Sequence, residues 1–213
     1  MFGIDLKGVP FKEVKIGEIC EMRNRGSDYY KQSEIVGPHE GAMIIQPPNI
    51  VNNKLYFDDV QYYSWTGYNK KPDLNIQIGD ILLVKMAAVG APFKSAVVTE
   101  LPEPAITNSS IHIFKNIRCN TAYLQLIISS VEFQRRLKSS QTGSGSLFTI
   151  KQSTLLEMPI LLPPMEYQNR IGEELLNYRE NNNALIQALE KETQMRKKQY
   201  DWISDSILWH TSS

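Results

Sequence analysis

The feature that most constrains this chain is a strand-like segment that stops abruptly and is followed by a long uninterrupted one. The stretch ILLPPMEYQNRI, Ile160–Ile171, contains two consecutive prolines, and from there to about Leu208 the chain has no further proline and a single glycine. Pro163 favours an extended conformation for the residue before it. Pro164 suits the first turn of a helix, where its missing N–H has no partner to lose. We therefore predict a helix of about 44 residues, roughly 65 Å long.

A stripe of mostly apolar residues runs along this predicted helix. Positions 171, 175, 178, 182, 185 and 189 step by four and three residues, the heptad spacing of a coiled coil. Thr193 and Arg196 interrupt the stripe, which resumes with a shift of about four residues, as in a stutter. A helix of this length cannot bury its stripe against one domain, so we expect it to meet another helix. The residues predicted to form this interface are Ile171, Leu175, Tyr178, Leu185, Leu189, Tyr200 and Ile203.

The chain before the prolines is predicted to form mainly short strands. Residues Glu13–Met22 alternate largely with period two, and Gly79-Asp80 marks a turn before a buried strand. Residues Thr121–Ser140 carry apolar side chains at helical spacing, with Thr121 as the predicted N-cap. Strands with few helices and no regular alternation indicate the α+β class. We predict a globular domain over residues 1–163, with a mixed or antiparallel sheet, followed by a long coiled-coil-forming helix over residues 164–209.

Charge and cysteine content narrow the class of protein. The 213 residues include 23 Lys and Arg and 23 Asp and Glu, so a DNA-binding face would have to be a local patch. Cys20 and Cys119 match neither a zinc spacing nor a disulfide framework, and we expect buried free thiols. No segment has the apolar length of a membrane span or of a signal peptide core. We expect a cytoplasmic protein without a membrane partner.

Motifs for catalysis are missing from the sequence. It contains no Gly-x-x-x-x-Gly-Lys-Ser/Thr phosphate loop and no Gly-x-Ser-x-Gly nucleophile elbow. The three histidines, His39, His112 and His210, show no metal-ligand spacing. His112 lies inside an alternating strand and is expected to be structural. We expect no catalysis by this chain alone, no metal and no bound cofactor.

Two clusters favour binding instead. Basic residues alternate with aromatic and amide residues in RNRGSDYYK, residues 23–31, and in YYSWTGYNKK, residues 62–71. Lys and Arg contact phosphates, Arg reads guanine edges, and Asn or Gln reads adenine. For either cluster alone, an ordinary polar loop is the simpler interpretation. The candidate DNA-binding residues, chosen by chemistry and loop position, are Arg23, Arg25, Tyr30, Lys31, Tyr68, Asn69, Lys70, Lys85 and Lys94.

The order of five segments resembles half of a type I restriction-modification specificity subunit. They are IGEICEMRN, IGDILLVKMAAVGAPFKSAVV, ITNSSIHIF, FTIKQSTLLEMPILLPPMEYQNRI and MRKKQYDWISDSIL, which together span nearly the whole chain. The most specific pieces are LPPMEYQNRI and RKKQYDW. The resemblance implies a target recognition domain that reads one half of a bipartite DNA site, followed by a helix that spaces the two reading heads.

The resemblance also implies partners. Subunits of this family usually carry two recognition domains and two antiparallel helices, which seat modification subunits that methylate adenine with S-adenosylmethionine. A restriction subunit completes the full complex. This sequence shows one domain and one helix, so we expect a second copy to complete the arrangement as an isologous homodimer. Two identical domains would then read a split palindrome.

Three other interpretations remain open at the level of sequence. The chain is alternatively a coiled-coil scaffold or adaptor whose globular part binds protein, or a silent half-subunit that never assembles. A third alternative is a DNA methyltransferase or a fragment of one, against which the missing cofactor and catalytic motifs argue.

Overall fold

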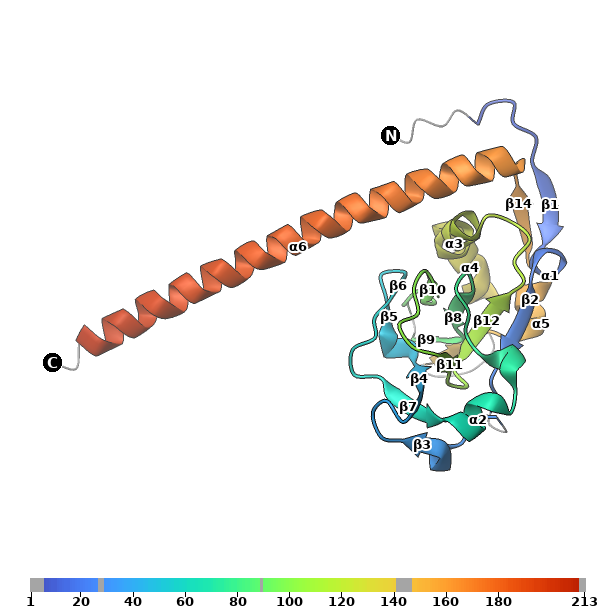
Figure 1. Ribbon diagram of the computed structural model, residues 1–213. Coiled ribbons are helices and arrows are strands. Elements are labelled where there is room, and N and C mark those ends of the chain that lie inside the picture. Colours follow the sequence, from blue (N-terminus) through green and yellow to red (C-terminus); the bar gives the residue numbers. More distant parts are fainter. Residues whose placement is uncertain (1–5, 27–28, 89, 141–146, 211–213) are drawn as a thin grey trace. The chain divides into compact units, whose positions relative to one another are not determined.

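The structure is a computed structural model that describes residues 6–26, 29–88, 90–140 and 147–210 (Figure 1). The chain divides into two compact units, Met1–Gly172 and Glu173–Ser213. We call the first unit the head and the second the helical unit, and each is described by itself.

The elements follow one another as short pieces until the last helix. The strands are β1 Lys12–Lys15, β2 Glu21–Asn24, β3 Ile35–Val36, β4 Gly41–Ile45, β5 Ile50–Val51, β6 Lys54–Leu55, β7 Gln61–Ser64, β8 Ile81–Val84, β9 Met86–Ala88, β10 Ser95–Val97, β11 Ala105–Thr107, β12 Ile111–Lys115, β13 Leu147–Thr149 and β14 Pro159–Leu162. The helices are α1 Ile16–Ile19, α2 Trp65–Asn69, α3 Thr121–Ser129, α4 Val131–Ser139, α5 Gln152–Leu156 and α6 Met165–His210, with 3₁₀ turns at Gln32–Glu34, Pro47–Asn49 and Pro72–Leu74.

Two four-stranded sheets form the centre of the head. One has the order β10-β8-β12-β2 and is antiparallel throughout. The other has the order β11-β4-β7-β3, in which β11 runs parallel to β4 and the remaining pairs are antiparallel. Two-stranded pairs β1-β14, β13-β9 and β5-β6 complete the described strands. The α+β class with a mixed sheet is confirmed.

Three apolar clusters alternate with these sheets. Because successive side chains of a strand point to opposite faces, β8 sends Ile81 and Leu83 into one cluster and Leu82 and Val84 into the next. The first cluster also holds Phe114 and the helical residues Leu124, Phe133, Leu137 and Leu155; the second holds Met43, Ile45, Tyr62 and Ile113; the third holds Ile44, Tyr63 and Ile106. Both sheets are therefore covered on both faces, and every residue of β4, β8 and β12 is buried.

Two predicted elements are each interrupted in the structure. The predicted strand Glu13–Met22 is broken by α1, which turns the chain from β1 to β2. The predicted helix Thr121–Ser140 is divided at Ser130, which ends α3 and also caps α4 by accepting from the Phe133 amide. Its N-cap is Asn120 rather than Thr121, because the Asn120 carboxamide oxygen accepts from the Tyr123 amide at 2.9 Å.

Three smaller expectations are confirmed. Cys20 and Cys119 are free and buried. The turn before β8 exists, with Gly79 at a φ of +92°. His112 is buried, with its Nε2 3.0 Å from the Ile150 carbonyl oxygen, which fits a structural role.

The first turns of α6 are joined to α3 inside the head. The Gln168 carboxamide accepts from the Asn120 amide at 3.0 Å and donates to the Pro163 carbonyl at 2.8 Å. Asn120 Nδ2 donates to Asn169 at 3.0 Å. A Cβ on Gly172 would lie 2.5 Å from Asn120 Oδ1, so only glycine lets the two helices approach this closely. The segment QNRIG thus holds the first turns of α6 against the start of α3.

The helical unit continues α6 to His210. Of the predicted interface residues, Ile171 is half-buried in the head and Leu175 is buried, whereas Tyr178, Leu185 and Leu189 are exposed. The side chains of Tyr200 and Ile203 lie outside those that the structure describes. Coiled-coil pairing through this helix stays a prediction, as do the domain limits at residues 163 and 164.

Candidate nucleic-acid interface

The outer face of the sheet β11-β4-β7-β3 carries the third apolar cluster and is covered by α2. Ser64 caps this helix by accepting from the Gly67 amide at 3.0 Å. Gly67 is needed because a Cβ there would lie 2.3 Å from Cε1 of Tyr63. Trp65, the first residue of α2, is exposed, and its ring centroid lies 5.7 Å from that of Tyr68, edge to face.

A second segment, residues 29–34, lies against the same helix. The Tyr30 ring stacks on Tyr63 with centroids 5.6 Å apart. The Lys31 amide donates to the Tyr63 hydroxyl at 3.0 Å, and the Lys31 side chain is exposed. Tyr29 is also exposed, and the ammonium group of Lys71 lies 5.0 Å from its ring centroid, a cation–π contact that brings the two segments together.

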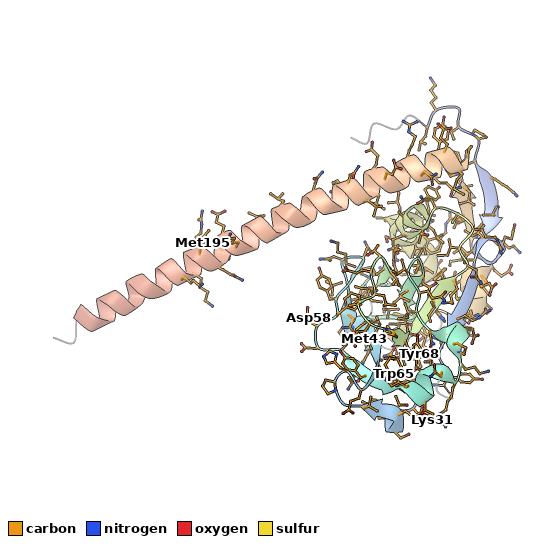
Figure 2. The ribbon with its side chains drawn as sticks, viewed as in Figure 1. Lys31, Met43, Asp58, Trp65, Tyr68 and Met195 are labelled. Atoms are coloured by element: carbon orange, nitrogen blue, oxygen red, sulfur yellow. The ribbon has the colours of Figure 1, made fainter. Side chains whose placement is uncertain are left out.

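These contacts assemble a surface that we call the aromatic–basic face. Figure 2 shows Lys31, Trp65 and Tyr68 at the end of the head where α2 and β3 lie. The face consists of exposed side chains from both segments together with the half-buried ring of Tyr68. Its members are Tyr29, Lys31, Trp65, Tyr68, Asn69, Lys70 and Lys71.

One carboxylate within this surface, that of Glu34, forms hydrogen bonds with two neighbouring side chains. Glu34 accepts from the Lys70 ammonium group and from the Tyr63 hydroxyl. These two hydrogen bonds, that of Lys70 first, hold the pKa of Glu34 below its usual value. Burial and the bond to Glu34 raise the pKa of Tyr63, so its hydroxyl keeps its proton. Glu34 is therefore ionised and paired, and it does not add a free negative charge to the face.

Arg25 requires a correction to the predicted set. Its side chain is 0% exposed, so it cannot contact DNA directly in this conformation. Its Nη1 donates to the carbonyls of Tyr29 at 3.2 Å and Gly67 at 3.3 Å, and its Nη2 donates to Asn75 Oδ1 at 2.7 Å. Arg25 thus lies beneath the face and connects its two segments.

The remaining basic candidates lie apart from one another. Arg23, on β2, pairs with Glu21 at 2.5 Å and Asp73 at 3.7 Å, so its charge is shared with carboxylates. Lys85 follows β8 and Lys94 precedes β10, two strands of the other four-stranded sheet, and the Val84 amide donates to the Lys94 carbonyl. Among the described residues, no hydrogen bond or ion pair joins either lysine to α2. The structure gathers the predicted residues Tyr30, Lys31, Tyr68, Asn69 and Lys70.

Three members of the face were absent from the predicted set. Tyr29, Trp65 and Lys71 all fall within the two basic and aromatic clusters of the sequence. The sequence signal that could have found them is their position in the same two clusters as the predicted residues. Their side chains are exposed, whereas that of their neighbour Tyr63 is buried, and the sequence pattern does not show this difference.

A hollow elsewhere on the head has a different charge from the aromatic–basic face. It has a volume of about 490 Å³ and is lined by Gln46, Pro48, Asn49, Tyr56, Asp58, Asp59 and Gln61. Two carboxylates line it and no lysine or arginine does, so it would repel phosphate. The distribution of charged side chains on the head therefore favours the aromatic–basic face as the surface that binds a polyanion.

The part of the chain that the structure describes contains neither a metal-binding cluster nor a membrane-spanning helix. No group of three His, Cys, Asp or Glu side chains among them is placed to hold a metal ion. No helix in that part of the chain combines the length and hydropathy of a membrane span.

Known proteins resemble this chain over most of its length. It is 25% identical over 198 residues to the type I restriction enzyme MjaVIII specificity subunit of Methanocaldococcus jannaschii, a match that covers 92% of this chain and 44% of the relative. The HsdS subunit from Thermoanaerobacter tengcongensis shares its fold with a TM-score of 0.59 at 19% identity, covering 87% of this chain and 41% of that one. A chain from a structure describing assembly of the type I R-M system gives a TM-score of 0.64 at 18% identity, covering 92% and 45%.

The chain therefore spans a little under half the length of the relatives that it matches. A family model described as type I restriction modification DNA specificity domain matches residues 8–195, and this confirms the resemblance seen in the sequence. With most of its residues matched by that model, the chain belongs to the family of type I restriction-modification DNA specificity domains.

Proposed function

We propose that this chain recognises double-stranded DNA as a specificity subunit of a type I restriction-modification complex, and that it does so through the aromatic–basic face. The observation that carries this proposal is that the exposed lysines Lys31 and Lys71, and Lys70 paired with Glu34, share one face with the exposed rings of Tyr29 and Trp65 in a chain of this family. Lysines attract phosphates, and amide and aromatic side chains contact base edges. The chain supplies recognition, the modification subunit methylates adenine, and the restriction subunit cleaves.

The first experiment tests the recognition role itself. The chain is co-expressed with a candidate modification subunit from the same organism, and modified adenines are mapped by single-molecule sequencing. Methylation at one defined bipartite sequence is the expected result. A soluble complex that methylates no DNA would contradict the proposal and favour a silent subunit. A chain that binds no methyltransferase at all would favour the scaffold interpretation.

Variants then test the face. Lys31→Gln combined with Lys71→Gln should weaken DNA binding by the complex and lower the log–log salt slope by about 2, because each phosphate contact contributes about 0.9. The matched control is Lys12→Gln combined with Lys54→Gln, since both of these lysines are exposed and lie on β1 and β6, outside the face. An equal change in the two double variants would refute the assignment of the face.

The second half of the proposal concerns assembly. In the helical unit Leu185 is 60% exposed and Leu189 is 54% exposed, one helical turn apart. Leucines at this spacing are stabilised by the same stripe on a second helix. We take the occupant to be a second copy of α6 in antiparallel orientation, because that arrangement is self-complementary along the whole stripe. Two identical heads would then read an inverted repeat, with the paired helices as spacer and as seat for the modification subunits.

Leu185→Glu tests this assembly. The substitution places a charge in the stripe and should convert the dimer to a monomer in analytical ultracentrifugation, while the thermal unfolding of the head is unchanged. Gln194→Glu adds the same charge to an exposed position away from the stripe and should leave the dimer intact. A Leu185→Glu chain that still dimerises would show that the stripe is not the interface. Methylation at two unrelated half-sites would show that the partner is a different chain.

A further inference from the structure

Arg25 is an unusual buried cation. None of its side chain is exposed, and within the described part of the chain no carboxylate lies within ion-pair distance of it. Its partners are two backbone carbonyls, one carboxamide oxygen and the face of the Tyr63 ring, 5.8 Å from the guanidinium carbon. Its Nε finds no hydrogen-bond partner among the residues that the structure describes. A buried charge that is hydrogen-bonded only to neutral acceptors among the described residues lowers stability, so packing alone does not account for an arginine here.

The partners of Arg25 belong to three separate segments. Tyr29 belongs to the segment 29–34, Gly67 lies in the middle of α2, and Asn75 follows the 3₁₀ turn Pro72–Leu74. The first two segments carry the exposed side chains of the aromatic–basic face. A planar guanidinium has donors in a fixed fork, so it sets the distance between the acceptors it joins. Among the described side chains, Arg25 is therefore the one that bonds to the backbone of both segments, and the Tyr63 hydroxyl, which donates to the same Tyr29 carbonyl at 3.1 Å, and the Lys71–Tyr29 contact support the same placement.

The third partner connects this fork to the core. The backbone carbonyl of Asn75 accepts from the Lys115 ammonium group at 2.8 Å, and the same ammonium group pairs with Asp80 at 2.8 Å. Lys115 lies on β12, and both members of this pair are less than a tenth exposed. Asn75 is thus held by the central sheet, and its carboxamide holds Arg25. A chain of contacts thus leads from Asp80 through Lys115 and Asn75 to Arg25. Arg25 in turn bonds to the backbone of Tyr29 and of α2.

From this geometry we propose that Arg25 is a positioning residue for DNA sequence discrimination, an inference that rests on the proposed function. Lysines that contact phosphates have flexible side chains and tolerate small displacements of the backbone. Contacts with base edges do not, because they carry the geometric information that distinguishes one base pair from another. Loss of the fork should therefore reduce discrimination between DNA sequences more than it reduces affinity for DNA.

The test uses the full chain in complex with its modification subunit. Once the wild-type pair has identified its site, methylation rates are measured on that site and on sites with one changed base pair. Arg25→Lys keeps the charge and removes the fork, and Arg25→Met removes both. We expect the ratio of the two rates to fall about tenfold in Arg25→Lys, which corresponds to the loss of one base contact, and at least as far in Arg25→Met. The salt slope of DNA binding should stay unchanged.

A control separates positioning from stability. Leu155→Ala removes a buried side chain from the first cluster, on α5, far along the fold from the face. It should lower the amount of active complex and leave the ratio unchanged, because the ratio does not depend on the folded fraction. If Arg25→Met does not fold, the ratio in Arg25→Lys decides.

The outcomes distinguish the two proposals. A wild-type pair without methylation would refute the proposed function, and the positioning role with it. An active wild-type pair whose ratio is retained in Arg25→Lys would overturn the role of Arg25 alone. A ratio that falls equally in Leu155→Ala would also overturn it, since discrimination would then follow general stability.

Discussion

The helices over the sheet β10-β8-β12-β2 and the short segments over the sheet β11-β4-β7-β3 cover their sheets in different ways. The first layer, α1 with α3, α4 and α5, closes over a large cluster of buried aliphatic and aromatic side chains. The second layer, α2 with residues 29–34, closes over three buried apolar residues and is held by hydrogen bonds to Arg25, Tyr63 and Glu34.

The difference separates two tasks. Apolar packing contributes large free energies without direction, whereas hydrogen bonds contribute less and fix geometry. The first layer therefore accounts for most of the stability of the head. The second layer accounts for the placement of a few exposed side chains. Substitutions in the two layers should produce different effects.

The largest expected effect is in the first layer. Phe114 is 0% exposed, and Phe114→Ala should lower the free energy of unfolding by about 3–5 kcal/mol through lost transfer energy and an unfilled cavity. Urea denaturation measures this. Phe11→Ala is the matched control, because Phe11 is 41% exposed and should change stability by about 0.5 kcal/mol. Similar losses at both positions would contradict the assignment of the core.

A smaller loss of stability is expected in the second layer. Gly67→Ala places a methyl group against the buried Tyr63 ring and should displace α2, at a cost of about 1–3 kcal/mol. DNA binding should fall further than this cost explains, because Trp65 and Tyr68 move with the helix. Gly26→Ala is the control, since a Cβ there meets nothing within 4 Å. A Gly67→Ala complex that binds DNA normally would show that the placement of α2 does not matter.

Substitutions at Gly172 and Asn120 test whether the contact between α6 and the start of α3 also fixes geometry in the first layer. Gly172→Ala should give no net gain, because the methyl group meets Asn120 Oδ1 and disturbs the α3 cap. After Asn120→Ala, which itself should cost about 1 kcal/mol, the same change should stabilise the head by about 1 kcal/mol through helix propensity. A double-mutant cycle in urea measures the difference. Additive effects would refute the contact.

The effect that is smallest at neutral pH concerns the thiols of the first layer. Burial raises the pKa of Cys20 to about 12 and that of Cys119 to about 11, from about 9 in the unfolded chain. The folded chain therefore keeps these protons where the unfolded chain loses them. Their contribution to stability is full below pH 9 and declines as the pH rises toward 11 and 12.

Alkylation and denaturation check this behaviour. Iodoacetamide should leave both thiols unmodified at pH 8 in the folded protein and modify both in urea. The urea midpoint should fall less between pH 9 and pH 11 in a Cys20→Ala, Cys119→Ala chain than in the wild type. Rapid alkylation at pH 8 would show that the first layer admits solvent.

The sequence predicted the parts of the fold that depend on local pattern. The buried strand Ile81–Val84, the turn at Gly79 and the structural role of His112 follow from runs of apolar residues and from glycine conformation. The interruptions at α1 and Ser130 did not follow, because period-two and helical patterns continue across both breaks. Tertiary packing of β1 against β14, and the capping of α4 by Ser130, decide those positions.

The candidate site was predictable in composition and not in exposure. Both clusters that form the aromatic–basic face are visible as basic, aromatic and amide residues. Arg25 and Lys31 look alike in the sequence, yet one is buried and the other exposed. The acceptors that bury Arg25 include Gly67 and Asn75, which are distant in sequence, and no local pattern carries that information.

The pairing of β1 with β14 has a consequence for the timing of folding. Lys12 pairs with Leu162, so β1 is synthesised about 150 residues before its partner. At about 5–20 residues per second on the ribosome, β1 waits roughly 8–30 s with an unpaired edge. The head is completed only when the strand that leads into α6 emerges. A chain interrupted before this point would expose β1 and the apolar cluster beneath it, which makes early termination products targets for chaperones and proteases.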